Sequence, residues 1–387
     1  MLGLDDILAP LGAATFLGDH LGRRPAHFAE RAPPLPGWSE LAELLNMSTL
    51  WSAETFAVLR DGTPVPIDEY CEAATDRDLQ PVQRPVAARV LALQDAGAVL
   101  VAKQIETLAP ALKQITIALE AGLGAHATAD LYVHGTPSAL PPLMALTDLL
   151  VIPIAGALSA EIDAGTLEHP VAHPRLAKDT ATPVRGARLL DAALLPGHRL
   201  YVPRGNVLTR RTTATDTSYL LFALQRPIGL DLLQALVDIA VDDPLVRADL
   251  PADPAARDAH RAALAQRFAE LASGSPGVAA QAQLDQRFQR DLSPYALNAG
   301  MVAGNTARFR RNATQLQVVE TTTGWLLRAA RGAVPIPAGR ETQVAWIVAR
   351  PEFTRAELAA AFPDADAALL DGLVRDLAAM KVIATVV

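Results

Sequence analysis

Two side chains able to bind a ligand or exchange protons with it lie two residues apart, Tyr132 and His134, in the segment Asp-Leu-Tyr-Val-His. Side chains alternate between the two faces of a β-strand, so we expect this pair to point to one side. A histidine there could bind a ligand or act as an acid or base near neutral pH. The alternative is a hydrogen-bonded pair with only a structural role. The sequence leaves both interpretations open.

A second pair, His169 and His173, has the spacing of two zinc ligands. Pro170 and Pro174 prevent the helix that would align the two imidazoles, so an ordinary loop is the favoured interpretation. His198 follows a glycine and is expected in a turn. The chain contains no glycine-rich phosphate loop, no Gly-x-Ser-x-Gly and no His-Glu-x-x-His. We therefore predict no metal site and assign no catalytic residue.

Composition excludes several classes of partner. The 387 residues carry a net charge of -8, which repels a phosphate backbone, so no nucleic-acid partner is expected. The helix expected near residue 370 is acidic, so it would repel DNA phosphates and is not expected to enter a DNA groove. The longest apolar run, 149–158, is too short to cross a bilayer, and acids near the N-terminus argue against a signal peptide. A single cysteine requires no oxidising compartment. We predict a cytoplasmic protein with no membrane partner.

The elements that must position these residues are short strands. Several short apolar runs lie between residues 130 and 224, separated by glycine and proline. Many strands at this spacing favour a barrel or a double-sheet jelly roll. The expected strands are 131–133, 149–154, 188–190, 199–202 and 219–224.

Helical patterns flank these strands and give an α+β chain. Two short helices are expected before residue 30, one at 38–45 and a long one at 105–121, after a buried strand at 98–101. After Pro227 the pattern is helical to about residue 297. The last segment predicts helix, helix, helix, strand, which is the winged-helix order, over 343–349, 354–361, 365–380 and 382–387. The predicted domains are 1–225, 226–305 and 306–387.

Four segments occur in an order that is informative: Phe-Leu-Gly-Asp-His-Leu-Gly-Arg-Arg-Pro at 16–25, the strand at 130–134, Asp-Leu-Leu-Val-Ile-Pro-Ile-Ala-Gly at 148–156, and Pro-Gly-x-x-Leu-Tyr-x-Pro-Arg-Gly at 196–205. Together they resemble the JmjC-type cupin oxygenases of the ribosomal oxygenase group, which use iron(II) and 2-oxoglutarate to hydroxylate protein side chains. The resemblance covers nearly the whole chain. It implies a jelly-roll (double-stranded β-helix) core, a helical dimerisation region and a C-terminal winged helix.

The resemblance also implies where the metal and co-substrate residues would be, and they are missing. The His-x-Asp pair of the family falls on Leu143 and Ala145, and the later histidine on Leu208. The basic residue that would hold 2-oxoglutarate falls on Leu158. If the register slips so that Asp148 takes the acid position, its partner becomes Leu146 and Leu208 is unchanged. Alkyl groups have no lone pair for iron, so we expect neither iron nor 2-oxoglutarate to be used.

Three hypotheses about function follow from this pattern. The first is a homodimeric pseudo-oxygenase that binds a peptide, a protein or a small molecule in the barrel cleft, with Tyr132, His134, Asp148 and Arg204 as binding residues. The second is an enzyme with rebuilt chemistry that uses some combination of these four side chains without the metal geometry of the family. The third is a working iron oxygenase whose ligands lie elsewhere in the sequence. We favour the first.

Overall fold

The computed structural model describes residues 2–29, 35–76, 79–288, 308–311, 316–321, 324–329, 332–336, 339–379 and 382–386. The chain divides into two compact units, Met1–Arg290 and Asp291–Val387. The expected boundary after residue 225 lies within the first unit, and the one after residue 305 lies outside the described residues.

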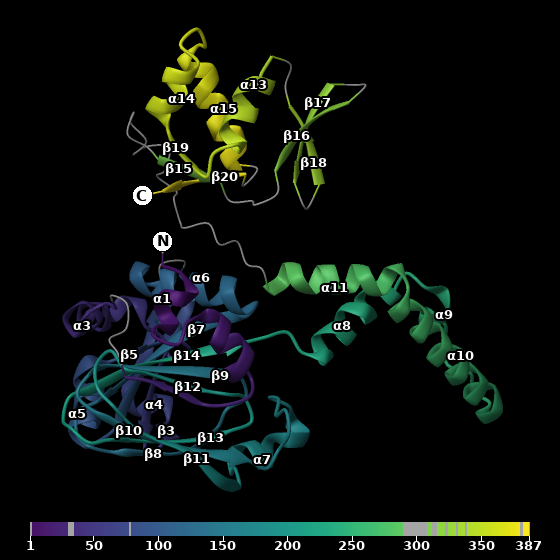
Figure 1. Ribbon diagram of the computed structural model, residues 1–387. Helices are drawn as coiled ribbons and strands as arrows, with labels where there is room; N and C mark the ends of the chain where they lie inside the picture. The colour runs from purple at the N-terminus through teal and green to yellow at the C-terminus, as the bar shows by residue number, and fades with distance from the viewer. Residues whose placement is uncertain are drawn as a thin grey trace. The chain divides into compact units, whose positions relative to one another are not determined.

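Two antiparallel sheets form the centre of the first unit (Figure 1). The large sheet has eight strands in the order β1 (Ala26–Phe28), β12 (Arg199–Val202), β9 (Asp148–Ala155), β14 (Thr217–Gln225), β7 (His126–His134), β6 (Val99–Ala102), β2 (Phe56–Arg60) and β3 (Thr63–Pro64). The small sheet has four, in the order β11 (Arg185–Leu194), β10 (Leu158–Gly165), β13 (Val207–Thr212) and β8 (Ala139–Met144). The predicted combination of helices with a large antiparallel sheet is confirmed.

Three strands of the small sheet, β8, β10 and β13, were not predicted from the sequence. β8 contains Pro141 and Pro142, which argue against a strand, but its position at the edge of the sheet needs fewer backbone donors. β13 is half polar, with the sequence Val-Leu-Thr-Arg-Arg-Thr, so no apolar run marks it.

The predicted helix at 105–121 is wrong at its start. Residues Ile105–Thr107 form a 3₁₀ turn, and the helix proper, α6, spans Pro110–Leu123. Pro110 takes the first helical position, where its missing N–H costs nothing, and Gly124 ends the helix in a left-handed conformation.

The large sheet separates two apolar cores because its side chains alternate between its faces. Leu131, Val133, Leu150 and Ile152 pack outward against α1 (Leu4–Leu8), α3 (Trp38–Asn46) and α6. The opposite face packs against the small sheet in what we call the interior cluster. Its buried members are Ala145, Leu149, Val151, Leu158, Ala160, Ile162, Ala192, Leu194, Leu200, Val202, Leu208, Tyr219 and Leu221, with Tyr132, Leu143, Leu190 and Ala223 partly buried.

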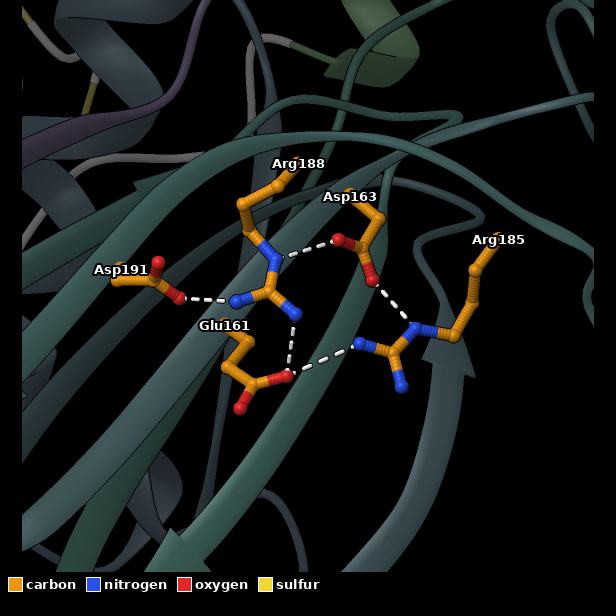
Figure 2. A network of polar contacts seen from close by, with 5 residues as sticks. All are labelled: Glu161, Asp163, Arg185, Arg188 and Asp191. Atoms are coloured by element: carbon orange, nitrogen blue, oxygen red, sulfur yellow. Dashed lines mark hydrogen bonds and ion pairs between the residues drawn. The ribbon is translucent and has the colours of Figure 1, made fainter.

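The outer face of the small sheet carries a network of charged side chains between β10 and β11 (Figure 2). Asp163 accepts hydrogen bonds from Arg185 Nε at 2.5 Å and from Arg188 Nε at 2.6 Å. Glu161 accepts from Nη2 of both arginines, and Asp191 accepts from Nη1 of Arg188. We call these five residues the outer network; it ties the long strand β11 to β10.

Smaller elements connect these layers: α2 (Ala13–Thr15), a π-helical turn at Phe16–His20, 3₁₀ turns at Ser48–Leu50 and Pro174–Leu176, α4 (Ile67–Tyr70), β4 (Cys71–Thr75), β5 (Pro81–Pro85), α5 (Ala87–Asp95) and α7 (Ala177–Ala181).

Helices follow β14: α8 (Gly229–Ala240), α9 (Pro244–Arg247), α10 (Pro254–Ser273) and α11 (Ser275–Phe288). Figure 1 shows them as a helical group that extends from the end of β14. They pack through Ala235, Leu236, Ala240, Leu271 and Ala280. The predicted helical segment is confirmed to Phe288; its continuation to residue 297 lies outside the described residues.

The second unit has its own apolar core. Its elements are β15 (Arg308–Arg311), β16 (Gln317–Thr321), β17 (Gly324–Ala329), β18 (Gly332–Pro335), α13 (Glu341–Val348), β19 (Glu352–Thr354), α14 (Arg355–Ala361), α15 (Ala367–Ala379) and β20 (Ile383–Val386). Two three-stranded sheets form, β19-β15-β20 and β16-β17-β18. In the described part of the whole chain, no helix is both long and apolar enough to cross a bilayer.

Candidate functional site

The three positions at which the resemblance places metal ligands lie together inside the jelly roll. Leu208 of β13 is the register partner of Leu143 on β8, and Ala145 follows just after β8. All three belong to the interior cluster, and Leu208 and Ala145 are almost completely buried. Leu158 lies in the same cluster, opposite Thr212. The interior at these positions is packed with hydrocarbon.

A polar group lies beside them, and two of its members are the predicted residues Tyr132 and His134. Tyr132 is the register partner of Tyr219 on β14, and their rings stack 5.0 Å apart at an angle of 4°. The His134 ring lies 5.7 Å from that of Tyr219. Arg210 reaches the rings from the opposite sheet, with its Cζ 5.1 Å from the Tyr132 centroid and 5.8 Å from that of Tyr219. We call these four residues the interior polar group.

Arg210 is the unusual member of the interior polar group. Its relative exposure is 5%, and its Nε and Nη1 atoms make no hydrogen bond of proper geometry with any described residue. Burial opposes the charged guanidinium, but the nearby phenolic oxygens of Tyr219 and Tyr132 outweigh it, and the pKa of Arg210 is raised. The arginine therefore keeps its charge inside the jelly roll.

His134 is held as a neutral imidazole. Its Nδ1 is hydrogen-bonded to Ser138 Oγ at 2.7 Å, and its Nε2 has no partner among the described residues. Burial, and secondly the charge of Arg210, lower the pKa of His134 to about 4. A base this weak is poorly matched to proton transfer at neutral pH.

The other two predicted site residues, Asp148 and Arg204, lie in a different polar cluster. Asp148 begins β9, on the sheet face opposite to Leu149 of the interior cluster. Its carboxylate accepts a hydrogen bond from the backbone N–H of Arg204 at 2.8 Å and one from Arg226 Nε at 2.9 Å. These contacts fix the turn after β12 and the segment after β14.

The Arg204 side chain also binds backbone. Its Nε and Nη2 donate to the carbonyl oxygens of Pro170 and His169, each at 2.8 Å. The structure thus brings Tyr132 and His134 together and brings Asp148 and Arg204 together, as two separate groups.

The remaining histidines do not assemble a site. His169 and His173 are exposed in the loop between β10 and β11. His173 Nδ1 accepts a hydrogen bond from the backbone N–H of Arg175, and His198 Nδ1 lies 3.3 Å from His27 Nε2. Within the described ranges, no three histidine, cysteine or acidic side chains are grouped closely enough to hold a metal ion.

Sequence reasoning missed Arg210 and Tyr219. One signal was present for the arginine: Arg210 follows Leu208 by two residues, so a strand that directs Leu208 inward also directs Arg210 inward. The pattern alone does not show that this strand exists.

The solved structure of YcfD from Escherichia coli has the same arrangement of elements. It matches 98% of this chain and 100% of its own, with 14% sequence identity and a TM-score of 0.52. YcfD is a ribosomal oxygenase. This chain has the fold of the JmjC-type ribosomal oxygenases. The resemblance found in the sequence is confirmed at the level of the fold.

A second structure of the same ribosomal oxygenase, in complex with cobalt and 2-oxoglutarate, matches 96% of this chain and 97% of its own, with 14% identity and a TM-score of 0.49. No protein-family model and no curated protein sequence matches the chain.

The JmjC-type fold implies an iron ion and 2-oxoglutarate, and the interior residues do not fit the iron. Leu143, Ala145 and Leu208 offer only alkyl groups, which cannot coordinate a metal. Arg210 lies two strand positions from Leu208, about 7 Å along β13, and its positive charge opposes a second cation. No chemical step through iron can be assigned to these residues.

Proposed function

We propose that this chain is a catalytically degenerate JmjC-like protein, a pseudo-oxygenase that binds a ligand inside its jelly roll without iron chemistry. One observation carries the proposal: the positions of the three expected metal ligands converge in space and are filled by Leu143, Ala145 and Leu208. Convergence supports the register from which these positions were taken. The scaffold is retained, while the space of the metal is occupied by packed hydrocarbon.

The interior polar group supports binding in preference to catalysis. The rebuilt-enzyme hypothesis draws on some combination of Tyr132, His134, Asp148 and Arg204, and the structure engages the last two in contacts that hold loops, apart from the first two. His134, with a pKa of about 4, is a poor base at neutral pH. Tyr132 and His134 remain as residues that face the proposed ligand.

The test measures cobalt(II) binding by the full chain. The chain is loaded anaerobically, and bound cobalt is detected by its visible absorption and by elemental analysis. The matched control restores the three ligands, Leu143→His, Ala145→Asp and Leu208→His, in a single variant. We expect no stoichiometric cobalt in the native chain and a gain of cobalt absorption in the variant. Cobalt bound by the native chain, together with consumption of 2-oxoglutarate when iron(II) is supplied, would contradict the proposal.

Homodimerisation through the helices after β14 is part of the same proposal. Four large apolar side chains are exposed at helical spacing along α8 and its C-cap: Leu230, Leu233, Val237 and Val241. Such a stripe suits a partner helix from a second copy of the chain. Leu233→Glu should convert a dimer into a monomer in light-scattering measurements, whereas Arg261→Glu, at an exposed position of α10, should not. A cytoplasmic location and a winged-helix fold for the second unit stay predictions. For this unit we propose a role in protein contacts.

A further inference from the structure

The interior of the jelly roll contains a cation for which the described chain supplies no anion. Arg210 is buried between the sheets, and no aspartate or glutamate of the described residues pairs with its guanidinium. It contacts the rings of Tyr132 and Tyr219, and its charge acts on the neutral His134. Buried arginines in folded proteins are normally paired and hydrogen-bonded, so this one indicates a missing partner.

The unpaired polar atoms around Arg210 include several hydrogen-bond donors. Arg210 Nε and Nη1 can only donate hydrogen bonds, and the hydroxyl of Tyr219, also buried, makes no hydrogen bond of proper geometry with the described residues. His134 Nε2 is unpaired beside them. A group of convergent donors around a positive charge calls for an acceptor with negative charge.

The surroundings select the kind of anion. The guanidinium lies over the tyrosine rings, and its unpaired Nε and Nη1 remain to donate to an acceptor such as a carboxylate. Beside it, Leu143, Leu158 and Leu208 present hydrocarbon that suits a carbon chain and not the hydration shell of an inorganic ion. Tyr132 and Leu143 are only partly buried, so the interior reaches solvent at these residues.

We propose that the jelly roll binds a small organic carboxylate, whose carboxylate group accepts hydrogen bonds from Arg210 and from the Tyr219 hydroxyl while its carbon chain lies against the leucines. The inference deepens the proposed function and rests on it, because an anion can pair with Arg210 without a metal ion only if the leucines have replaced the metal site. Tyr132 forms one wall of the site and His134 one end.

The experiment is a calorimetric titration of the full chain with acetate, propionate, succinate and glutarate, each in buffer freed of metal by a chelating resin, with chloride and phosphate as inorganic comparisons. The matched variants are Arg210→Gln and Arg211→Gln, because Arg211 is the next residue of β13 and is exposed on the outer face. We expect at least one carboxylate to bind the native chain and the Arg211 variant equally. Arg210→Gln should weaken that binding at least tenfold. If Arg210→Gln does not fold, Arg210→Lys provides the test. It keeps the positive charge but loses the planar pair of guanidinium donors, so it should also weaken binding.

Two results would overturn the inference: carboxylate binding that is unchanged by both Arg210 substitutions, or binding of chloride or phosphate without any of the four carboxylates. Failure of the proposed function looks different. In that case carboxylates bind only after cobalt(II) is added, and the dependence on metal, not the dependence on Arg210, identifies the error.

Discussion

The small sheet carries arginines on both of its faces, and the arginines of the two faces differ in burial and in acidic partners. On the outside, Arg185 and Arg188 share Asp163 and Glu161, so each guanidinium has acidic partners (Figure 2). On the inside, Arg210 has aromatic rings and no acid among the described residues. The outer arginines are exposed and paired, whereas the inner one is buried and unpaired.

This contrast separates a structural role from a binding role. A paired arginine completes its hydrogen bonds within the chain, and its energetic effect is modest where water screens the charges. A buried arginine without an acid costs stability until something else supplies the negative charge. The outer network therefore holds β11 in place, whereas Arg210, on the inner face of the same sheet, is the residue that we propose binds a ligand.

The contrast is tested most strongly by replacing each arginine with methionine. Arg210→Met removes an unpaired buried charge and keeps an apolar side chain of similar length, so in carboxylate-free buffer we expect the free energy of unfolding to rise by about 1–4 kcal/mol. Arg188→Met should lower it, because Asp163 and Glu161 lose a partner. Urea unfolding of both variants gives the comparison. A loss of stability in Arg210→Met equal to that in Arg188→Met would show that the interior arginine is structural.

The pH dependence of stability distinguishes the buried histidine from the exposed ones. The pKa of His134 is about 4 in the folded chain and about 6.5 in the unfolded chain. Between pH 6.5 and 4 the unfolded chain therefore binds a proton at this histidine, whereas the folded chain does not. Stability should fall by about 3 kcal/mol as the pH decreases from 6.5 to 4. His134→Gln should remove this decrease, and His173→Gln in the exposed loop should not. Identical pH profiles for native chain and His134→Gln would contradict the buried, neutral state.

The smallest effect is expected in the outer network. Burial would raise the pKa of Asp163, but the hydrogen bonds from Arg188 and Arg185 hold it below the usual range. Asp163→Asn should reduce stability by about 1 kcal/mol near neutral pH, since the arginines are half exposed and screened. Because the folded pKa is lowered, this contribution exists above pH 4 and should disappear as the pH falls further. A cost that persists at pH 2 would mean that packing, and not charge, gives Asp163 its effect.

Much of the fold could be predicted because apolar runs mark the strands of the large sheet. The runs near residues 131, 150 and 220 all became central strands, β7, β9 and β14. The small sheet was harder because one of its strands contains two prolines and another is half polar. Its pairing, which brings Leu143 beside Leu208, depends on contacts distant in sequence.

The candidate site was half predictable for the same reason. Tyr132 and His134 share a face by simple alternation. The sequence does not predict the face of the sheet to which Asp148 points, because the run after it is apolar on both faces and shows no alternation. Arg210 is an ordinary surface residue by type, and only the packing of β13 against the large sheet turns it inward.

The most direct test of the account asks whether the interior responds to a carboxylate or to a metal. The chain has five tyrosines, so labelling with 3-fluorotyrosine gives few fluorine resonances, and Tyr132→Phe and Tyr219→Phe assign the two interior ones. The account predicts that a carboxylate that binds in calorimetry shifts these two resonances in metal-free buffer. It also predicts that paramagnetic cobalt(II) leaves them unchanged. Broadening of both by cobalt(II), with no response to any carboxylate until metal is added, would show that the jelly roll is a metal site after all.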